Sequence, residues 1–427
     1  MTDPFPSQRL RRFLILYHLA WVVLFPVILG YLWWRGRRDP DYRRHLSERF
    51  GRNHPKPRAV WVHAVSLGEF RSADPLIRAL LLRGEAVVIT VFTPAGRRAA
   101  NSAFANQIAE GSVQVSWVPF EFGWTYRRFF RAFAPKYGLV MEVEIWPRMI
   151  MAARTAGVPL FMCNAQYPSQ SAVRDAKRLP WRADLMRGFA GALVKSDLQR
   201  DRFAAIGVAN IRVTGELRFD QPIPDTLVTA GMAARQVIAP HRPVVVISSA
   251  VEGEDDLYIA AMQAVPGTLF IYVPRAPERF AAVAGMIRTK GLRMARRSEV
   301  FDPDLALLAP IGDVDVILGD SLNEMYFYIA MADRAVIGGG FHPNGAHNII
   351  ESLALKKPAI VGPHIDTIEY PAIEAIAAGV CTQVQDLSGL IDAMTNPMTA
   401  PHIDRFFATH AGAVPRTLAA LDDLTSR

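Results

Sequence analysis

The stretch WVHAVSLGE, residues 61–69, is the most informative segment of this chain. Its first five residues favour a β-strand, and the serine, leucine and glycine that follow indicate a turn. Residues 70–82 then have the apolar spacing of an amphipathic helix. Gly68 and Glu69 are therefore expected where a strand passes into a helix, which is where open α/β sheets bind ligands. In the plainer interpretation, Glu69 only complements the positive end of the helix dipole.

The same alternation of buried strand and helix continues along the chain on both sides of a proline-bearing segment, QPIPD at 221–225. Near-continuous apolar runs separated by helices predict parallel sheets. We therefore expect two Rossmann-like halves with a cleft between them. The predicted strands after the first are 86–93, 113–120, 137–147, 158–165, 191–197 and 211–220, and then 243–250, 268–275, 315–320, 334–340 and 358–363.

Length and cysteine content agree with this organisation. A chain of 427 residues is too long for one ordinary domain, so two are expected. Cys163 and Cys381 have neither metal-binding nor redox spacing, and His63 and His347 are isolated from them. We predict no metal site and no disulfide, and a reducing compartment.

The charge of the chain is concentrated near its N-terminus. The net charge is +8, and residues 1–60 hold twelve Lys and Arg against four Asp and Glu, so the rest is neutral overall. Nucleic-acid binders more often carry a basic patch on the folded domain. Here the basic residues flank an apolar segment, which indicates a membrane surface rather than a nucleic acid as partner.

Residues 13–34 contain no formally charged side chain and are long enough to span a bilayer. A cleaved signal peptide is disfavoured by the length, by the arginines that follow at once, and by the missing small-residue cleavage site. We favour a single membrane anchor. A helix lying in the membrane interface is the stronger of its two rivals, because Pro26 interrupts the segment. Arginines are denser on the C-terminal side, which predicts that the catalytic domains lie on the cytoplasmic side.

Several polar residues stand at the ends of predicted strands. Glu142 and Glu144 are two residues apart on one strand and would share a face. Structural salt bridges are the plainer interpretation, and we expect it to hold for one of the two. Arg218 ends the last strand of the first half, and Arg275 ends a strand of the second half, where a guanidinium suits phosphate.

Three glycines, residues 338–340, end another strand and would let a ligand approach the backbone. Their spacing matches neither a dinucleotide-binding fingerprint nor a P-loop, so it supports neither NAD nor ATP. Glu351 is expected in the first turn of the next helix. It could accept hydrogen bonds from a ribose or only complement the helix dipole.

These segments together resemble the Kdo transferases of lipopolysaccharide synthesis, which move 3-deoxy-D-manno-octulosonic acid from CMP-Kdo to lipid A precursors. The resemblance covers nearly the whole chain. The motifs that carry it, in family order, are WWRGRRDPDYRRHLSERFG, HAVSLGE, TPAGRR, MEVEIWP, TGELRFD, EGED, VPRAPERF, GDSLNE, GGG with AHNIIE, and VGPH.

The resemblance implies a GT-B fold with two Rossmann-like domains facing a cleft, an N-terminal membrane-anchor helix and no metal or other cofactor. The implied parts are an anchor with basic flanks at 1–38, an acceptor-binding domain at 39–220, a linker at 221–240, a CMP-sugar-binding domain at 241–404 and a C-terminal helix at 405–427. The implied partners are the lipid A precursor (lipid IVA), the CMP-activated sugar and the inner membrane.

By matching position, the resemblance also implies residue roles. Glu69 would be the general base of an inverting transfer, Glu142 a second carboxylate supporting the transition state, and Arg218 the counterpart of the family's lysine. The CMP would be held by Pro274, Arg275, Leu322, Asn323, Glu324, Asn348, Ile349, Ile350 and Glu351.

The chain departs from the family pattern at several positions. Val251 and Ala276 stand where histidines are usual, and Gln166 and Gln170 replace two arginines. These departures leave three alternatives open: a diverged paralogue with another CMP-activated acidic sugar or acceptor, a non-catalytic membrane-anchored CMP-sugar-binding protein, and a GT-B-like sugar-nucleotide epimerase. The last would not need an anchor.

Overall fold

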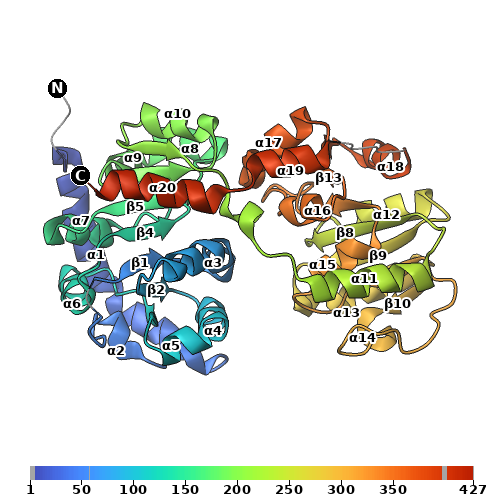
Figure 1. Cartoon of the computed structure of the whole chain (residues 1–427), viewed down its shortest axis with the longest axis horizontal. Coiled ribbons are helices and arrows are strands. Elements are labelled where there is room, and N and C mark those ends of the chain that lie inside the picture. The colour runs from blue at the N-terminus through green and yellow to red at the C-terminus, as the bar shows by residue number, and fades with distance from the viewer. Residues whose placement is uncertain (1–4, 57, 397–401, 427) are drawn as a thin grey trace. The chain divides into compact units, whose positions relative to one another are not determined.

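The computed structural model describes residues 5–56, 58–396 and 402–426. The chain forms two compact units, Met1–Gln221 with Ala411–Arg427, and Pro222–His410. Each unit is built on one seven-stranded sheet in which every strand pair is parallel. The predicted pair of parallel α/β sheets is thus confirmed (Figure 1).

The sheet of the first unit has the strand order β3-β2-β1-β4-β5-β6-β7. Its strands are β1 Val60–His63, β2 Val87–Val91, β3 Val113–Trp117, β4 Gly138–Met141, β5 Leu160–Ala165, β6 Gly191–Val194 and β7 Ile211–Val213. Its helices are α1 Gln8–Arg35, η1 Pro40–Tyr42, α2 Leu46–Arg49, α3 Leu67–Leu82, α4 Pro94–Ala103, α5 Ala105–Ala109, α6 Gly123–Phe133, α7 Pro147–Ala156, α8 Ser169–Arg178, α9 Pro180–Met186, α10 Asp197–Ala205, η2 Leu217–Asp220 and α20 Ala413–Thr425.

The sheet of the second unit has the order β10-β11-β9-β8-β12-β13-β14. Its strands are β8 Val244–Ala250, β9 Leu269–Pro274, β10 Met294–Arg296, β11 Val316–Leu318, β12 Arg334–Ile337, β13 Ala359–Val361 and β14 Cys381–Gln383. Its helices are α11 Asp225–Ile238, α12 Asp255–Ala264, η3 Pro277–Arg279, α13 Phe280–Thr289, α14 Arg297–Val300, α15 Met325–Met331, α16 Ile350–Ala354, η4 Asp366–Ile368, α17 Glu369–Ala377, α18 Leu387–Thr395 and α19 Ile403–His410.

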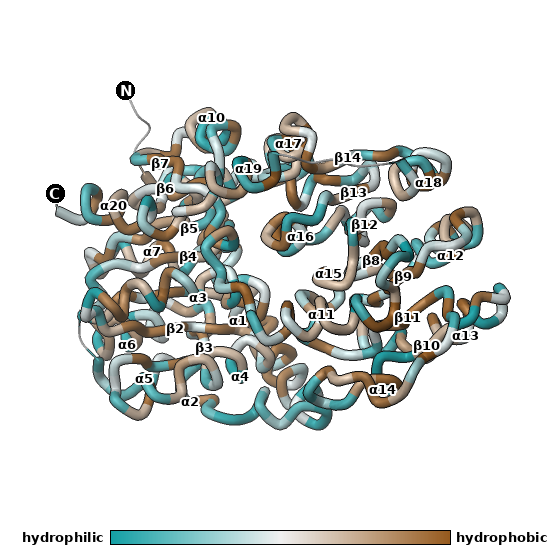
Figure 2. The backbone as a smooth tube through the Cα atoms, turned by 45° about the vertical axis from the view of Figure 1, so that its right-hand side comes forward, coloured by the Kyte–Doolittle hydropathy of each residue, from teal (hydrophilic) through white to brown (hydrophobic). Residues whose placement is uncertain are grey.

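Burial explains why the apolar runs became central strands. All residues of β1, β2 and β4 are buried, because helices cover both faces of a parallel sheet. Figure 2 colours the backbone by hydropathy, and these strands consist mostly of hydrophobic residues. The sequence did not predict β10 and β14, which are three residues long and lie at the two edges of the second sheet. Their apolar runs are too short to stand out from the neighbouring loops.

Two parts of the predicted domain plan differ from the structure. The segment 221–240, expected as a linker, is mostly helix α11, which packs on α15 in the second unit. The C-terminal helix expected over 405–427 is two helices, of which α19 belongs to the second unit and α20 to the first. Helix α20 packs on α3 and η2 (Figure 1).

Helix α1 contains the predicted apolar segment and is the described helix that is long and apolar enough to cross a membrane. One side of it packs along the first unit. Leu10, Leu14 and Leu32 are buried there, and the phenol of Tyr17 donates a hydrogen bond of 3.1 Å to Glu121. The other side presents exposed apolar side chains, among them Ile15, Leu16, Leu19, Val22, Val23, Leu24 and Val27.

Candidate functional site

Glu69 lies in the first turn of α3, just beyond the carboxyl end of β1. Ser66 is the N-cap residue, and its hydroxyl accepts a hydrogen bond from the Glu69 amide at 3.3 Å. The Glu69 carboxylate accepts one from the Val65 amide at 2.7 Å and one from the Ser66 hydroxyl at 3.2 Å. These contacts form a variant of the capping box, so Glu69 does stabilise the N-terminus of α3. Each carboxylate oxygen still has acceptor capacity for a substrate hydroxyl.

The surroundings of Glu69 favour its protonated form. Burial, followed by the negative charges of Glu144 and Glu142, raises the pKa of Glu69 to about 8. The hydrogen bonds at the helix terminus oppose this shift. A carboxylate with such a pKa is a far stronger base than an ordinary glutamate, which is the tuning expected of a catalytic group.

Glu142 and Glu144 do not share a strand face, contrary to the sequence prediction. Strand β4 ends at Met141, and both glutamates lie in the loop before α7. Glu142 has a positive φ of 56°, so the backbone leaves the strand geometry at once. Glu144 accepts a 2.7 Å hydrogen bond from the indole of Trp146 and has no ion pair among the described residues. Of these two glutamates, Glu142 is the one with an ion pair, a long contact of 3.8 Å to Arg218.

Arg218 connects Glu142 with helix α3. Its Nε donates a 2.7 Å hydrogen bond to the hydroxyl of Ser72, one turn beyond Glu69 on α3. Its Nη2 lies 3.8 Å from Oε1 of Glu142. The three residues predicted as catalytic, Glu69, Glu142 and Arg218, therefore gather at the carboxyl end of the first sheet.

A buried polar network holds the η2 turn that carries Arg218. Lys195 lies 2.6 Å from Glu216, and the Asn164 amide donates to the same carboxylate at 2.8 Å. The Asn164 carbonyl oxygen accepts from the Leu217 amide at 3.0 Å. Sequence reasoning missed Lys195 and Glu216, although each follows a strand, because the pairing joins segments far apart in the chain.

Trp146 is a second residue that the sequence analysis missed. Besides holding Glu144, its ring lies edge-on to His63 at 5.8 Å and to Phe92 at 5.9 Å between centroids. His63, the last residue of β1, is fully buried, and Nδ1 lies 2.8 Å from the hydroxyl of Thr90. Burial lowers the pKa of His63 to about 3, so this imidazole is neutral and supports the site structurally.

In the second unit, Pro274 ends β9 and Arg275 follows it. Nη1 of Arg275 lies 2.6 Å from Nδ1 and 2.8 Å from Nε2 of His347. Burial, together with the charge of Arg275, lowers the pKa of His347 to about 4, so the imidazole is neutral. Arg275 has no ion pair among the described residues, which leaves its charge available to an anion.

The glycines at 338–340 form a turn that Glu254 holds from the inside. Its buried carboxylate accepts hydrogen bonds from the amides of Gly339 at 2.8 Å, Phe341 at 2.9 Å and Val251 at 3.1 Å. The phenol of Tyr258 donates to it at 3.2 Å. Glu254 belongs to the EGED motif, and the structure shows that its role there is to shape the glycine turn.

The expectation that these glycines admit a ligand needs correction for all three. A Cβ on Gly339 would lie 2.4 Å from the carbonyl oxygen of Gly345. A Cβ on Gly338 would lie 2.5 Å from the carbonyl oxygen of Ser249, and one on Gly340 would lie 2.5 Å from the amide nitrogen of Gly362. The close approach is therefore made by the protein's own backbone. Gly339 has a positive φ of 86°, which glycine adopts without strain.

Glu324 is engaged within its own unit. Arg297 donates to both of its oxygens, at 2.7 and 2.8 Å, and the hydroxyls of Ser321 and Tyr328 donate to it as well. This arrangement fixes the start of α15, where Glu324 is the N-cap residue. A ribose hydroxyl that donates to the Glu324 carboxylate would therefore compete with these protein donors.

The remaining residues expected to contact CMP lie before α15 and around α16. Leu322 is exposed, and Asn323 has a positive φ of 64°. The side-chain oxygen of Asn348 accepts from the Ile350 amide at 3.0 Å and thereby closes the start of α16. Ile349 and Ile350 are buried, so they would meet a ligand only through their backbone.

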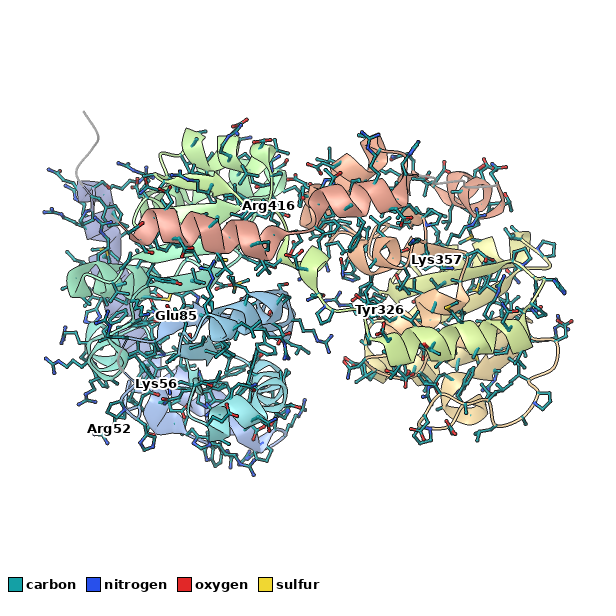
Figure 3. The ribbon with its side chains drawn as sticks, in the orientation of Figure 1. Arg52, Lys56, Glu85, Tyr326, Lys357 and Arg416 are labelled. Atoms are coloured by element: carbon teal, nitrogen blue, oxygen red, sulfur yellow. The ribbon has the colours of Figure 1, made fainter. Side chains whose placement is uncertain are left out.

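Glu351 lies in the first turn of α16, as predicted. Tyr326, labelled in Figure 3, is on the neighbouring helix α15. Burial, and after it the negative charge of Glu351, raises the pKa of this phenol.

Arg279 is paired within the second unit. It donates to the carboxylate of Asp255 and, at 2.9 Å, to the carbonyl of Ala250. Asp255 also accepts from the phenol of Tyr272 at 2.7 Å.

Among the described residues there is no group of three or more His, Cys, Asp or Glu that could hold a metal ion.

Comparisons with known proteins point to one family. A family model described as "3-Deoxy-D-manno-octulosonic-acid transferase (kdotransferase)" matches residues 44–221. The chain is 38% identical over 432 residues to the 3-deoxy-D-manno-octulosonic acid transferase of Bordetella pertussis. That match covers 95% of this chain and 98% of the relative.

Solved structures at low identity support the fold. UDP-GlcNAc 2-epimerase from Neisseria meningitidis is 12% identical with a TM-score of 0.55, covering 86% of this chain and 99% of its own. The Glycyrrhiza uralensis UGT73P12 structure is 13% identical with a TM-score of 0.59, covering 88% and 96%. These likenesses confirm the GT-B fold class, and because one neighbour is an epimerase, they show the fold alone.

Proposed function

The chain belongs to the family of 3-deoxy-D-manno-octulosonic acid (Kdo) transferases, which makes it a glycosyltransferase, and from this premise we propose that it moves Kdo from CMP-Kdo to a lipid A precursor, lipid IVA. The observation that carries the proposal is the 38% identity over 95% of the chain. This identity favours a transferase over an epimerase, because the epimerase structure shares only its fold with this chain.

In the proposed mechanism Glu69 is the general base. The acceptor hydroxyl must lose its proton as its oxygen attacks the anomeric carbon, so a carboxylate within hydrogen-bond reach is needed. The pKa of about 8 supports this role, because the carboxylate is basic and still deprotonates near physiological pH. Attack on the face opposite the departing CMP inverts the anomeric carbon.

The departing phosphate gains negative charge, and nearby cations stabilise that charge electrostatically. We assign this role to Arg275 and Arg218. Arg275 is supported by its lack of an ion pair among the described residues, and Arg218 by its long 3.8 Å contact to Glu142, which an anion could displace. Glu142 would in turn stabilise positive charge on the sugar ring. The proposed CMP contacts are Pro274, Leu322, Asn323, Glu324, Asn348, Ile349, Ile350 and Glu351.

We propose that α1 attaches the enzyme to the cytoplasmic side of the inner membrane as a helix in the plane of the interface. Its inner side is tied to the first unit at the N-terminal end and in the middle, and Leu32 near the C-terminal end is buried beside Phe120 and Phe122. Ser7 donates to Asp184 at 3.1 Å, Arg148 donates to the carbonyl of Leu14 at 3.0 Å, and Phe25 packs on Phe122 at 4.9 Å between ring centroids. A helix crossing the bilayer would lose these contacts.

A groove of the first unit, whose wall includes the Arg148 that contacts α1, supports attachment to an anionic surface. It lies between α6 and α7, has a volume of about 420 Å³, and carries Arg127, Arg131 and Arg148. Arg127 and Arg131 are four residues apart on α6, so they stand together on one face. Neither has a carboxylate partner among the described residues, and anionic headgroups would neutralise them.

Transfer of Kdo from CMP-Kdo to tetraacyl lipid A precursor, read by mass spectrometry of the products, tests the proposal. We expect the wild type to add one or more Kdo units and Glu69→Gln to add none, since the amide cannot accept the proton. The matched control is Glu110→Gln, an exposed glutamate of the same unit, which should retain activity. No transfer by a folded wild-type protein that binds CMP would contradict the proposal.

The replacements at Val251, Ala276, Gln166 and Gln170 give that experiment a second purpose. If CMP-Kdo is not used, other CMP-activated acidic sugars are screened in the same assay. Transfer from one of them would establish a diverged transferase, and CMP binding without any transfer would favour a membrane-anchored binding protein.

A further inference from the structure

An apolar pocket in the first unit lies between α1 and the carboxyl end of the sheet. It has a volume of about 260 Å³ and is lined by Trp21, Ile28 and Leu32 of α1 on one side and by Phe92, Phe120 and Trp146 on the other. We propose that this pocket binds a fatty acyl chain of the lipid acceptor. The proposal rests on the proposed function and specifies how the acceptor is recognised.

The lining of the pocket suits a hydrocarbon chain. Aromatic rings and aliphatic side chains form most of its walls, and the carboxylates of the site do not line it. Arg49 also contributes to the wall, but its guanidinium stacks over the ring of Trp117 at 4.3 Å and donates to the carbonyl of Phe92 at 3.3 Å.

The pocket is at the same edge of the sheet as the catalytic carboxylates. Phe92 directly follows β2, Phe120 follows β3, and Trp146 follows β4. Trp146 is the shared wall, because its indole donates to Glu144 while its ring lines the pocket. A chain in the pocket therefore places the rest of its lipid next to the group of residues that includes Glu69.

Helix α1 connects the pocket with the membrane. Ile28 and Leu32 line the pocket, whereas Val23 and Val27 on the same helix are exposed by 73% and 67%. Exposed apolar surface of this kind is expected to lie in hydrocarbon. A chain that leaves the bilayer beside α1 would thus pass from one apolar surface to another without crossing water, and this continuity identifies a membrane lipid as the occupant.

Ile28→Trp, which fills the pocket from α1, tests the proposal. The acceptors are the tetraacyl lipid A precursor and the same phosphorylated disaccharide with its acyl chains removed. We expect the variant to raise the KM for the acylated acceptor by about tenfold or more, as expected for losing the burial of two or more methylene groups. The kcat/KM for the deacylated acceptor should stay within about twofold.

Val27→Trp, next in the chain but on the outer side of α1, is the matched control and should leave both acceptors unaffected. Phe92→Ala is a second variant, which removes one pocket wall at a residue that is 40% exposed and hence tolerates substitution. It should weaken only the acylated acceptor. If Ile28→Trp and Phe92→Ala change both acceptors equally, or neither, the pocket does not hold an acyl chain.

Binding of the acylated acceptor without any CMP-sugar, measured by titration calorimetry in detergent, separates this proposal from the proposed function. If the wild type transfers no sugar but Ile28→Trp still weakens acceptor binding and Val27→Trp does not, the pocket assignment stands and the donor assignment falls. If the acceptor binds equally to wild type and Ile28→Trp, the pocket assignment falls, whatever the outcome of the transfer assay.

Discussion

At the residue scale, the properties of Glu69 depend on its neighbours more than on its helix position. The capping hydrogen bonds of a first-turn glutamate lower its pKa, yet burial and two nearby carboxylates raise it to about 8. Glu144 is the larger of the two charge contributions and is itself held by Trp146. The loop after β4 therefore tunes a residue that follows β1.

This tuning predicts a pH profile. The kcat/KM should rise with pH as Glu69 deprotonates and level off above about pH 8, because the base form is the ionised one. Glu144→Gln removes a negative charge near Glu69, so the pKa of Glu69 falls and the rising limb moves to lower pH. The measurement is kcat/KM from pH 5 to 10 for both proteins.

Glu110→Gln serves as the control for this series, since Glu110 is exposed and does not contribute to the pKa of Glu69. A rising limb that stays in place in Glu144→Gln would show that the observed ionisation does not belong to Glu69.

At the element scale, the turn at 338–340 is shaped by backbone packing. Gly340→Ala should destabilise the second unit by about 1–3 kcal/mol, because its Cβ would lie 2.5 Å from the Gly362 amide nitrogen and backbone cannot yield as a side chain does. Gly285→Ala is the matched control, an exposed position within α13 with nothing within 4 Å of the new Cβ.

Gly285→Ala should raise the free energy of unfolding by about 0.5–1 kcal/mol, because alanine loses less backbone entropy than glycine when a helix forms. Urea unfolding of the full chain measures both changes. Equal unfolding midpoints for the two variants would contradict the account of the glycine turn.

The proposed orientation of helix α1 predicts on which side of the membrane its two ends lie. In the in-plane arrangement both ends of the helix remain on the cytoplasmic side, whereas a spanning helix places them on opposite sides. Arg12→Cys and Arg38→Cys should therefore both resist a membrane-impermeant maleimide in intact cells and both react after permeabilisation.

The native Cys163 and Cys381 are buried and should give little background. Reaction of Arg12→Cys in intact cells, with Arg38→Cys protected, would identify a spanning helix and overturn the in-plane assignment.

At the scale of the whole molecule, the chain returns to the first unit at its C-terminal end. Asp220 accepts hydrogen bonds of 2.6 Å from the amides of Gly412 and Val414 and so fixes the start of α20. Arg416, labelled in Figure 3, donates to the carbonyl of Thr214 at 3.0 Å. Leu421 of α20 then packs in the core of the first unit.

Leu421→Ala should accordingly lower the stability of the first unit by about 2–5 kcal/mol, the usual effect of removing a buried leucine side chain. The control Leu82→Ala, 89% exposed on α3, should change it by no more than about 0.5 kcal/mol. Thermal unfolding of the full-length protein in detergent measures both. Equal effects of the two substitutions would show that α20 does not complete this core.

Features that depend on a local pattern could be predicted from the sequence. Apolar runs alternating with helices predicted two parallel sheets, and the step from WVHAV to the helix after Gly68 placed Glu69 at a strand–helix junction. Residues 13–34 likewise predicted the long apolar helix α1. Each of these follows from periodicity and propensity within one segment, which a single sequence displays directly.

Which residues meet depends on how the segments pack in three dimensions. Arg218 reaches Ser72 across 146 positions of the chain, Glu142 and Glu144 leave the strand they were expected to share, and α20 returns to the first unit. The pocket of Trp146 and α1 arises in the same way. Such contacts depend on how separate segments pack, and packing between distant segments leaves no periodic pattern in the sequence.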